Sequence, residues 1–185
     1  CDPVLQKGLE DCLTSLRLNE AVRDRNLSVV LVDITDPDCP RLAYANPNHM
    51  MYAASLPKIG ILLAWFATPS AAAKAMDPDV RHELGEMIKL SSNEAATRFS
   101  RELGLARVQA VLDAHGFYDA KRGGGIWFGK HYGRDSERVR DPVSGNTHAA
   151  TVRQLLRFYL LLEQDRLVSP EASAAMRDVF RSPAI

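Results

Sequence analysis

A serine and a lysine, Ser55 and Lys58, are the residues in this sequence best suited to chemistry, and they open an apolar stretch that runs from Ile59 to Ala67. On a helix, residues three apart share a face, so the hydroxyl and the amine can meet at one point. Serine needs a neighbouring base to act as a nucleophile, and a lysine in a dry pocket can lose its proton and serve as that base. Free N–H groups at the helix N-terminus can hold an oxyanion nearby. The alternative is an ordinary helix start, with Ser55 as the cap and Lys58 in solvent.

A second polar group, Ser91-Ser92-Asn93, lies downstream of the first. A serine hydroxyl can both donate and accept a hydrogen bond, as a proton relay must, and an asparagine amide offers a donor and an acceptor to a peptide group. The two motifs together predict a cleft in which the Ser91–Asn93 turn, between two helices, forms the wall opposite Ser55 and Lys58. The alternative for this group is a plain N-cap for a helix that begins at Glu94.

The elements that must position these motifs can be read from periodicity and turn signals. We expect an amphipathic helix over residues 4–24 and a β-hairpin formed by 27–34 and 41–44. From Ser55 to about residue 115 the pattern is helical, with segments at 55–67, 71–76, 77–88, 94–103 and 105–114.

The section 116–148 is rich in glycine and aromatic residues and is expected to be a long irregular loop. Two of its aromatic residues, Trp127 and Tyr132, are candidate walls of a substrate cleft, although packing onto the helices is the alternative. Two more helices are expected, over 152–163 and from Pro170 onward. We therefore predict an α/β (α+β) fold forming one structural domain: residues 1–54 supply a helix and hairpin, and 55–185 a helical lobe.

In the order of its elements and motifs, most of the chain resembles the penicillin-recognising serine enzymes, that is, class A-like serine β-lactamases and penicillin-binding proteins. The resemblance implies a β-lactamase/transpeptidase-like fold with a helical lobe and an antiparallel sheet lobe. It also implies that Ser55 is the acylated nucleophile, Lys58 its general base and Ser91 a proton relay. Asn93 would bind the substrate amide and help to orient the lysine.

Three departures from that family pattern stand out. The segment between Ser55 and Ser91 is shorter than is typical, and Ser92 stands where class A enzymes have aspartate. No Lys-Thr-Gly or Lys-Ser-Gly follows residue 150, so the sheet lobe is expected to be incomplete, and a C-terminal fragment is the expected partner that completes it. The glutamate pattern of the class A loop is also missing, and Glu137 is left as the candidate deacylation base, although its charged neighbours favour a solvated residue.

The function that the resemblance implies is that of a serine hydrolase acylated at Ser55 by β-lactams or by D-Ala-D-Ala-like peptidoglycan peptides. Without a clear deacylating glutamate, a long-lived acyl-enzyme is expected. Two alternatives remain open: a non-catalytic cell-wall-binding or sensor domain on the same fold, and a glutaminase-type amidohydrolase.

Composition limits the other function classes. The 23 basic and 23 acidic residues cancel, which argues against nucleic acid as a partner, and the histidines lack metal-ligand spacing, so no metal or cofactor is expected. Of the three cysteines, Cys12 and Cys39 are a candidate pair. Cys1 is a candidate lipid anchor or an ordinary thiol. The expected location is periplasmic or extracellular.

Overall fold

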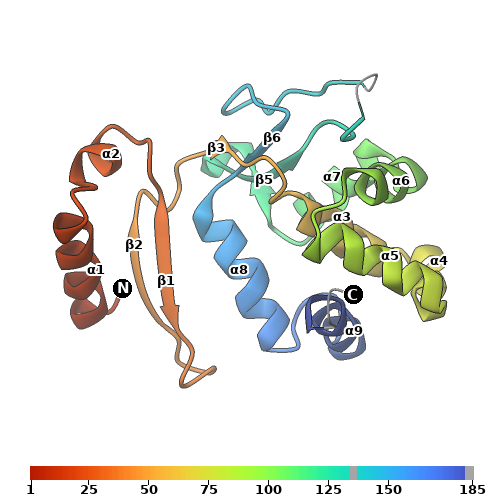
Figure 1. Cartoon of the computed structure of the whole chain (residues 1–185), viewed down its shortest axis with the longest axis horizontal. Helices are drawn as coiled ribbons and strands as arrows, with labels where there is room; N and C mark the ends of the chain where they lie inside the picture. Colours follow the sequence, from red (N-terminus) through yellow and green to blue (C-terminus); the bar gives the residue numbers. More distant parts are fainter. Residues whose placement is uncertain (134–136, 182–185) are drawn as a thin grey trace.

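Two small antiparallel sheets and a group of helices make up residues 1–133 and 137–181, the part of the chain that the structure, a computed structural model, describes (Figure 1). The α+β class predicted from the sequence is confirmed at this level. The more specific prediction of a β-lactamase-like fold is not confirmed. The predicted division at residue 54 stays a prediction.

The first sheet is a hairpin of β1 (Val29–Asp33) and β2 (Arg41–Ala45), close to where the sequence predicts it. Helix α1 (Pro3–Ser15) packs on β2, and the side chain of Gln6 closes the outer edge of that strand by bonding both the N–H and the C=O of Tyr44. On the other side of the hairpin lies α8 (Val152–Glu163) (Figure 1).

The predicted N-terminal helix over 4–24 is too long. Helix α1 ends at Ser15, and a separate short helix, α2, spans Asn19–Arg23. Between them Arg17 adopts a left-handed backbone with φ of 58°, which no α-helix can continue through. Apolar spacing persists across this break because both helices pack on the same small core, and so the pattern alone did not reveal it.

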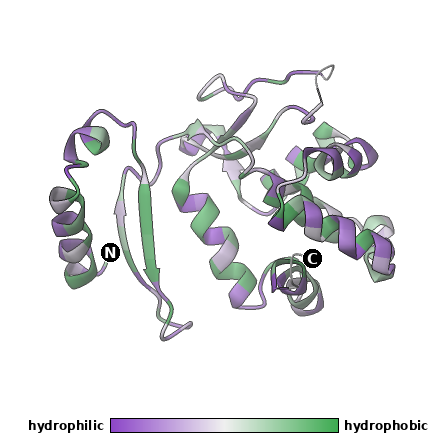
Figure 2. Cartoon of the chain, viewed as in Figure 1, coloured by the Kyte–Doolittle hydropathy of each residue, from purple (hydrophilic) through white to green (hydrophobic). Residues whose placement is uncertain are grey.

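Helix α3 (Lys58–Ala67) is the centre of the larger core. Nine of its ten residues are buried, as expected for a helix that is apolar all round (Figure 2). Trp65 packs edge-on against Phe99 with ring centroids 4.7 Å apart. Burying an aliphatic or aromatic side chain of this kind contributes about 1.5–3 kcal/mol, so α3 is held rigidly in place. The helices around it are α5 (Pro78–Lys89), α6 (Asn93–Leu103), α7 (Leu105–Ala114) and α9 (Pro170–Arg181).

A bend follows α3. The segment predicted as a helix over 71–76 is divided between α4 (Pro69–Ala72) and a 3-10 turn (Ala73–Met76). Among the described residues no single helix has the length and apolar character to cross a bilayer; α3 and this bent continuation, which meet at 96°, satisfy length and composition only when taken together.

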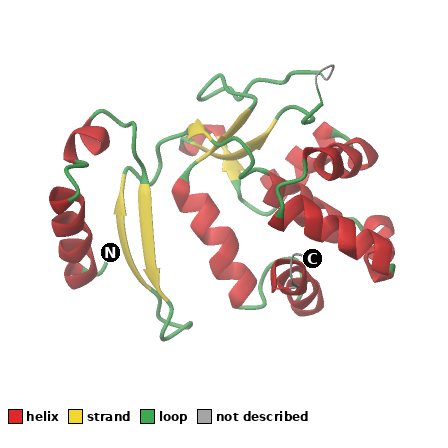
Figure 3. Ribbon diagram, in the orientation of Figure 1, coloured by secondary structure: helices red, strands yellow, loops and turns green. Residues whose placement is uncertain are grey.

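The section 116–148, expected to be irregular, contains most of a second sheet. Its strands are ordered β3-β6-β5-β4, all antiparallel (Figure 3). A Cβ on Gly125 of β5 would lie 1.9 Å from the carbonyl oxygen of Phe117, so glycine is needed for the strands to approach. Glycines that signal loops in the sequence therefore serve strand packing here. The bounds are β3 Met51–Tyr52, β4 Tyr118–Asp119, β5 Gly124–Phe128 and β6 His148–Ala150, with a 3-10 turn at Ala120–Arg122.

The three cysteines are all free and exposed. Cys12 and Cys39, the candidate pair from the sequence, form no disulfide.

Candidate functional site

The amine of Lys58 lies at the centre of a cluster of oxygen atoms. Its Nζ is 3.1 Å from Ser55 Oγ, 2.9 Å from Ser91 Oγ and 2.8 Å from Asn93 Oδ1. The backbone carbonyl of Ser91 is a fourth neighbour at 2.5 Å. We call these four residues the Lys58 cluster. The structure thus brings together the two motifs, Ser55 with Lys58 and the Ser91–Asn93 turn.

Ser55 lies in a tight turn just ahead of α3 rather than within the helix. The N–H of Lys58 donates to the carbonyl of Ser55 at 3.1 Å, and Ala54 before it has a left-handed φ of 45°. A non-glycine residue in this region is strained and needs support from its surroundings. One support is Tyr132, whose hydroxyl donates to the Ala54 carbonyl at 3.1 Å.

In the turn before α6, neighbouring residues have different roles. Ser92 is the N-cap, since its hydroxyl accepts from the N–H of Ala95 at 3.1 Å. Ser91, with φ of 57°, presents both its hydroxyl and its carbonyl to Lys58. The sequence left open that the whole Ser91–Asn93 motif is a helix N-cap. In the structure Ser92 alone is the cap, and Ser91 and Asn93 face the amine of Lys58.

Lys58 is only 2% exposed, and within residues 1–133 and 137–181 no carboxylate pairs with it. Burial without a counter-charge disfavours the ammonium form, so desolvation lowers the pKa of Lys58 below its ordinary value. A neutral amine fits these neighbours: two N–H groups donate to the Ser91 carbonyl and to Asn93 Oδ1, and the lone pair accepts from a serine hydroxyl.

An aromatic pair forms one wall of the cluster. The ring centroid of Tyr132 is 4.5 Å from Lys58 Nζ, and the His148 ring stacks on Tyr132 at 4.6 Å. Burial raises the pKa of the Tyr132 hydroxyl and lowers the pKa of His148. His148 donates from Nε2 to the Lys130 carbonyl at 2.8 Å, which fixes the orientation of the ring. Tyr132 was a sequence candidate; His148 was not, because no local signal links it to a motif far upstream.

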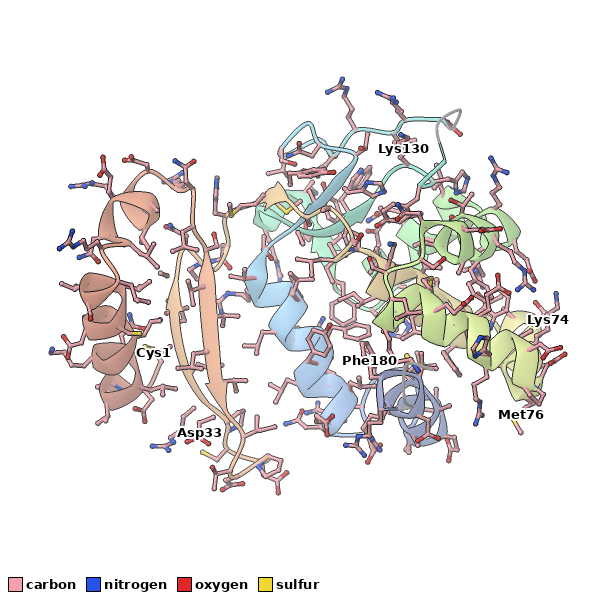
Figure 4. All side chains as sticks on the ribbon, in the orientation of Figure 1. Cys1, Asp33, Lys74, Met76, Lys130 and Phe180 are labelled. Carbon is pink, nitrogen blue, oxygen red and sulfur yellow. The ribbon has the colours of Figure 1, made fainter. Side chains whose placement is uncertain are left out.

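Two cavities meet the cluster. One, of about 170 Å³, lies on the Ser55 side and is lined there by Phe180 of α9, which faces α8 (Figure 4). The other, of about 470 Å³, lies on the side of Asn93 and Tyr132. The reactive groups therefore have room for a ligand on both sides.

Trp127 and Glu137, two other site candidates, lie elsewhere. Both line a separate cavity of about 360 Å³ beside α7. The indole N–H of Trp127 donates to the Val139 carbonyl at 3.0 Å, and Glu137 is exposed. The structure does not bring either residue to Ser55. In the described ranges no group of three histidine, cysteine, aspartate or glutamate side chains is placed to hold a metal ion.

A comparison with curated proteins finds a similarity to the large ribosomal subunit protein uL18 of Crocosphaera subtropica (strain ATCC 51142 / BH68). The two are 30% identical over 96 residues, which are 51% of this chain and 68% of that protein. By this similarity the chain belongs to the uL18 family. No family model matches the chain, and no solved structure does.

The similarity to uL18 contradicts the class of protein expected from the sequence. A member of a ribosomal protein family is not a penicillin-recognising serine enzyme, so the resemblance and the serine hydrolase function drawn from it are corrected, as are the cell-wall-binding and glutaminase alternatives. The similarity also conflicts with a β-lactam or peptidoglycan partner, with the exclusion of nucleic acid, and with a periplasmic or extracellular location. Balanced charge and short motifs gave no signal for such a family. The roles of individual side chains are a separate question, which the similarity does not address.

Proposed function

We propose that the Lys58 cluster makes Ser55 a nucleophile toward reactive acyl groups. The observation that carries this proposal is a buried lysine amine surrounded by two serine hydroxyls and two carbonyl oxygens, with no carboxylate of the described residues paired to it. Such an arrangement is costly to fold around an ammonium ion, and an apolar side chain would fill the space more cheaply. The proposal concerns reactivity at Ser55 and includes no turnover.

The acylation step follows from the hydrogen bonds. Neutral Lys58 accepts the proton from Ser55 Oγ as the oxygen attacks the carbonyl carbon of an ester, a new C–O bond to serine forms, and the bond to the leaving alcohol or phenol breaks. Ser91, bonded to the same amine, can pass the proton on to the leaving group. Asn93 holds the amine in place through its carbonyl oxygen.

Intact-protein mass measurement after treatment with p-nitrophenyl acetate tests this proposal. We expect an acetyl group on Ser55, located by peptide mapping so that it is distinguished from acetylation of the three exposed cysteines, and none at that peptide in Ser55→Ala. Ser92→Ala is the matched control, because it removes a neighbouring serine hydroxyl that caps α6 and does not face Lys58. Equal labelling of Ser55→Ala and the unaltered protein would refute the proposal.

A second candidate function is association with the large ribosomal subunit, which the name of the uL18 relative supports. RNA binding normally draws on an excess of lysine and arginine, whereas here 23 basic and 23 acidic residues balance. The charge of the chain thus gives this candidate no added support, and the similarity and the Lys58 cluster point to different functions.

Co-sedimentation with purified large ribosomal subunits decides the second candidate. If the chain associates through RNA phosphates, it should sediment with the subunit at low salt and be released as salt rises. If it stays in the supernatant even at low salt, the candidate fails. Neither result changes what is expected at Ser55, so the two proposals are judged separately.

A further inference from the structure

The cavity of about 170 Å³ beside Ser55 has polar groups at one end only. Ser55, Lys58 and Ser91 form that end. The remaining lining is apolar or aromatic and comes from the turn before α3 and from α3, α5, α8 and α9: Leu56, Ile59, Met87, Ile88, Tyr159 and Phe180. In the part of the chain that the structure describes, no carboxylate or guanidinium lines it.

The mouth of this cavity exposes large apolar surface. Leu56 is 51% exposed and Tyr159 42%, and the ring of Tyr159 meets Phe180 edge-on at 5.7 Å. Deeper in, Met87 is fully buried and Ile59 is 5% exposed. The wall is therefore continuous from surface to core, and Ser55 lies at its polar end.

We infer that this cavity selects the acyl group that Ser55 accepts, and that the preferred acyl group is small, uncharged and apolar. The inference rests on the nucleophilic role proposed for Ser55. Cavities of about 150 Å³ with apolar walls hold a benzene-sized molecule, so a branched four- or five-carbon acyl chain or a phenyl group fits this one. A carboxylate at the far end of the acyl chain would lose its water and find no positively charged partner along the apolar and aromatic part of the lining.

The rate of Ser55 acylation by matched p-nitrophenyl esters tests the inference. The leaving group is constant, and each rate is divided by the rate of hydroxide hydrolysis of the same ester, which removes intrinsic reactivity. We expect isovalerate to react at least about tenfold faster than acetate, and the succinate monoester to react more slowly than either.

Variants of Phe180 test whether the preference for isovalerate over acetate arises in this cavity. Phe180→Ala should lower the ratio of isovalerate to acetate rates several-fold. A cooperative urea unfolding transition like that of the unaltered protein shows separately that the variant folds. Phe180→Leu, which keeps an apolar wall, should retain most of the ratio.

The possible results distinguish the selectivity of the cavity from the nucleophilic role of Ser55. Labelling at Ser55 with no preference among the esters, or a preference for succinate, overturns the selectivity and leaves the nucleophile in place. A full isovalerate preference in Phe180→Ala also overturns the assignment to this cavity. Absence of labelling by every ester overturns both.

Discussion

Two basic side chains, Arg41 on the hairpin and Lys58 on α3, sit in opposite kinds of surroundings. The side chain of Arg41 is 54% exposed and forms an ion pair with Asp33 and a longer one, at 3.9 Å, with Asp2. Lys58 is 2% exposed, and the oxygens that its amine contacts among the described residues are all neutral.

The pKa shifts follow from these surroundings. The hydrogen bonds from Thr35, together with Arg41, lower the pKa of Asp33 to about 2, and the carboxylate of Asp33 raises the pKa of Arg41. Desolvation lowers the pKa of Lys58. The hairpin thus keeps its charges fixed over the whole physiological range, whereas the cluster on α3 favours loss of a proton. A charge held by carboxylates serves structure, and an amine held by hydroxyls is suited to proton transfer.

The largest expected effect comes from removing the amine. Lys58→Met keeps an unbranched chain of similar length, and we expect it to slow acylation of Ser55 by about 10²–10⁴-fold because the general base is lost. The rate is measured with p-nitrophenyl acetate by mass. Lys74→Met is the control, since Lys74 is exposed and paired with Glu102 at 2.6 Å. A fall smaller than about tenfold in Lys58→Met would remove the base role and with it the contrast with Arg41.

A second prediction concerns stability. The folded state depresses the pKa of Lys58 below the ordinary 10.5, so between these two values the unfolded chain binds the proton that the folded chain does not. The free energy of unfolding should therefore rise with pH in this window, by about 1.4 kcal/mol per pH unit at most, and level off above it.

Urea denaturation of the unaltered protein and of Lys58→Met at a series of pH values measures this contribution. The variant should lack it, so its stability relative to the unaltered protein should be greatest at the lower pH values and decline toward alkaline pH. Parallel pH dependences for the two proteins would mean that Lys58 is charged in the folded state.

The smallest effect is expected on the hairpin. Arg41→Met removes an exposed ion pair, and such pairs contribute little and are screened by salt. Its free energy of unfolding should differ only slightly from that of the unaltered protein, and the difference should shrink further in high salt. Acylation of Ser55 should not change. A loss of stability as large as that from a core substitution would show that the hairpin depends on this pair more than its exposure suggests.

Local spacing allowed much of the fold to be predicted. The hairpin, the buried helix after Ser55 and the helices from 77 to 114 lie close to their predicted positions, because each has a strong period and clear end signals. The second sheet was missed, since its strands are short and its glycines, such as Gly125, look like turn residues until their neighbours are known. The break at Arg17 was missed because apolar spacing continues on both sides of it.

For the candidate site, too, local sequence patterns predicted some residues and missed those brought in from distant elements. Ser55 with Lys58, and Ser91 with Asn93, could be paired by type and spacing, and their roles remain predictions. Trp127 and Glu137 were chosen for composition alone, and they line a different cavity. His148 behind Tyr132, and Phe180 beside Ser55, come from distant elements that only the folded chain brings together. The similarity to uL18 shows that the class of protein inferred from the motifs was wrong.

The pH dependence of Ser55 acylation tests most directly whether Lys58 is the neutral base. In the unaltered protein the rate should rise with pH and reach a plateau below 10.5, the ordinary pKa of a lysine, and Lys58→Met should lack that plateau. A rate that keeps climbing in proportion to hydroxide past 10.5, identically in both proteins, would contradict the account.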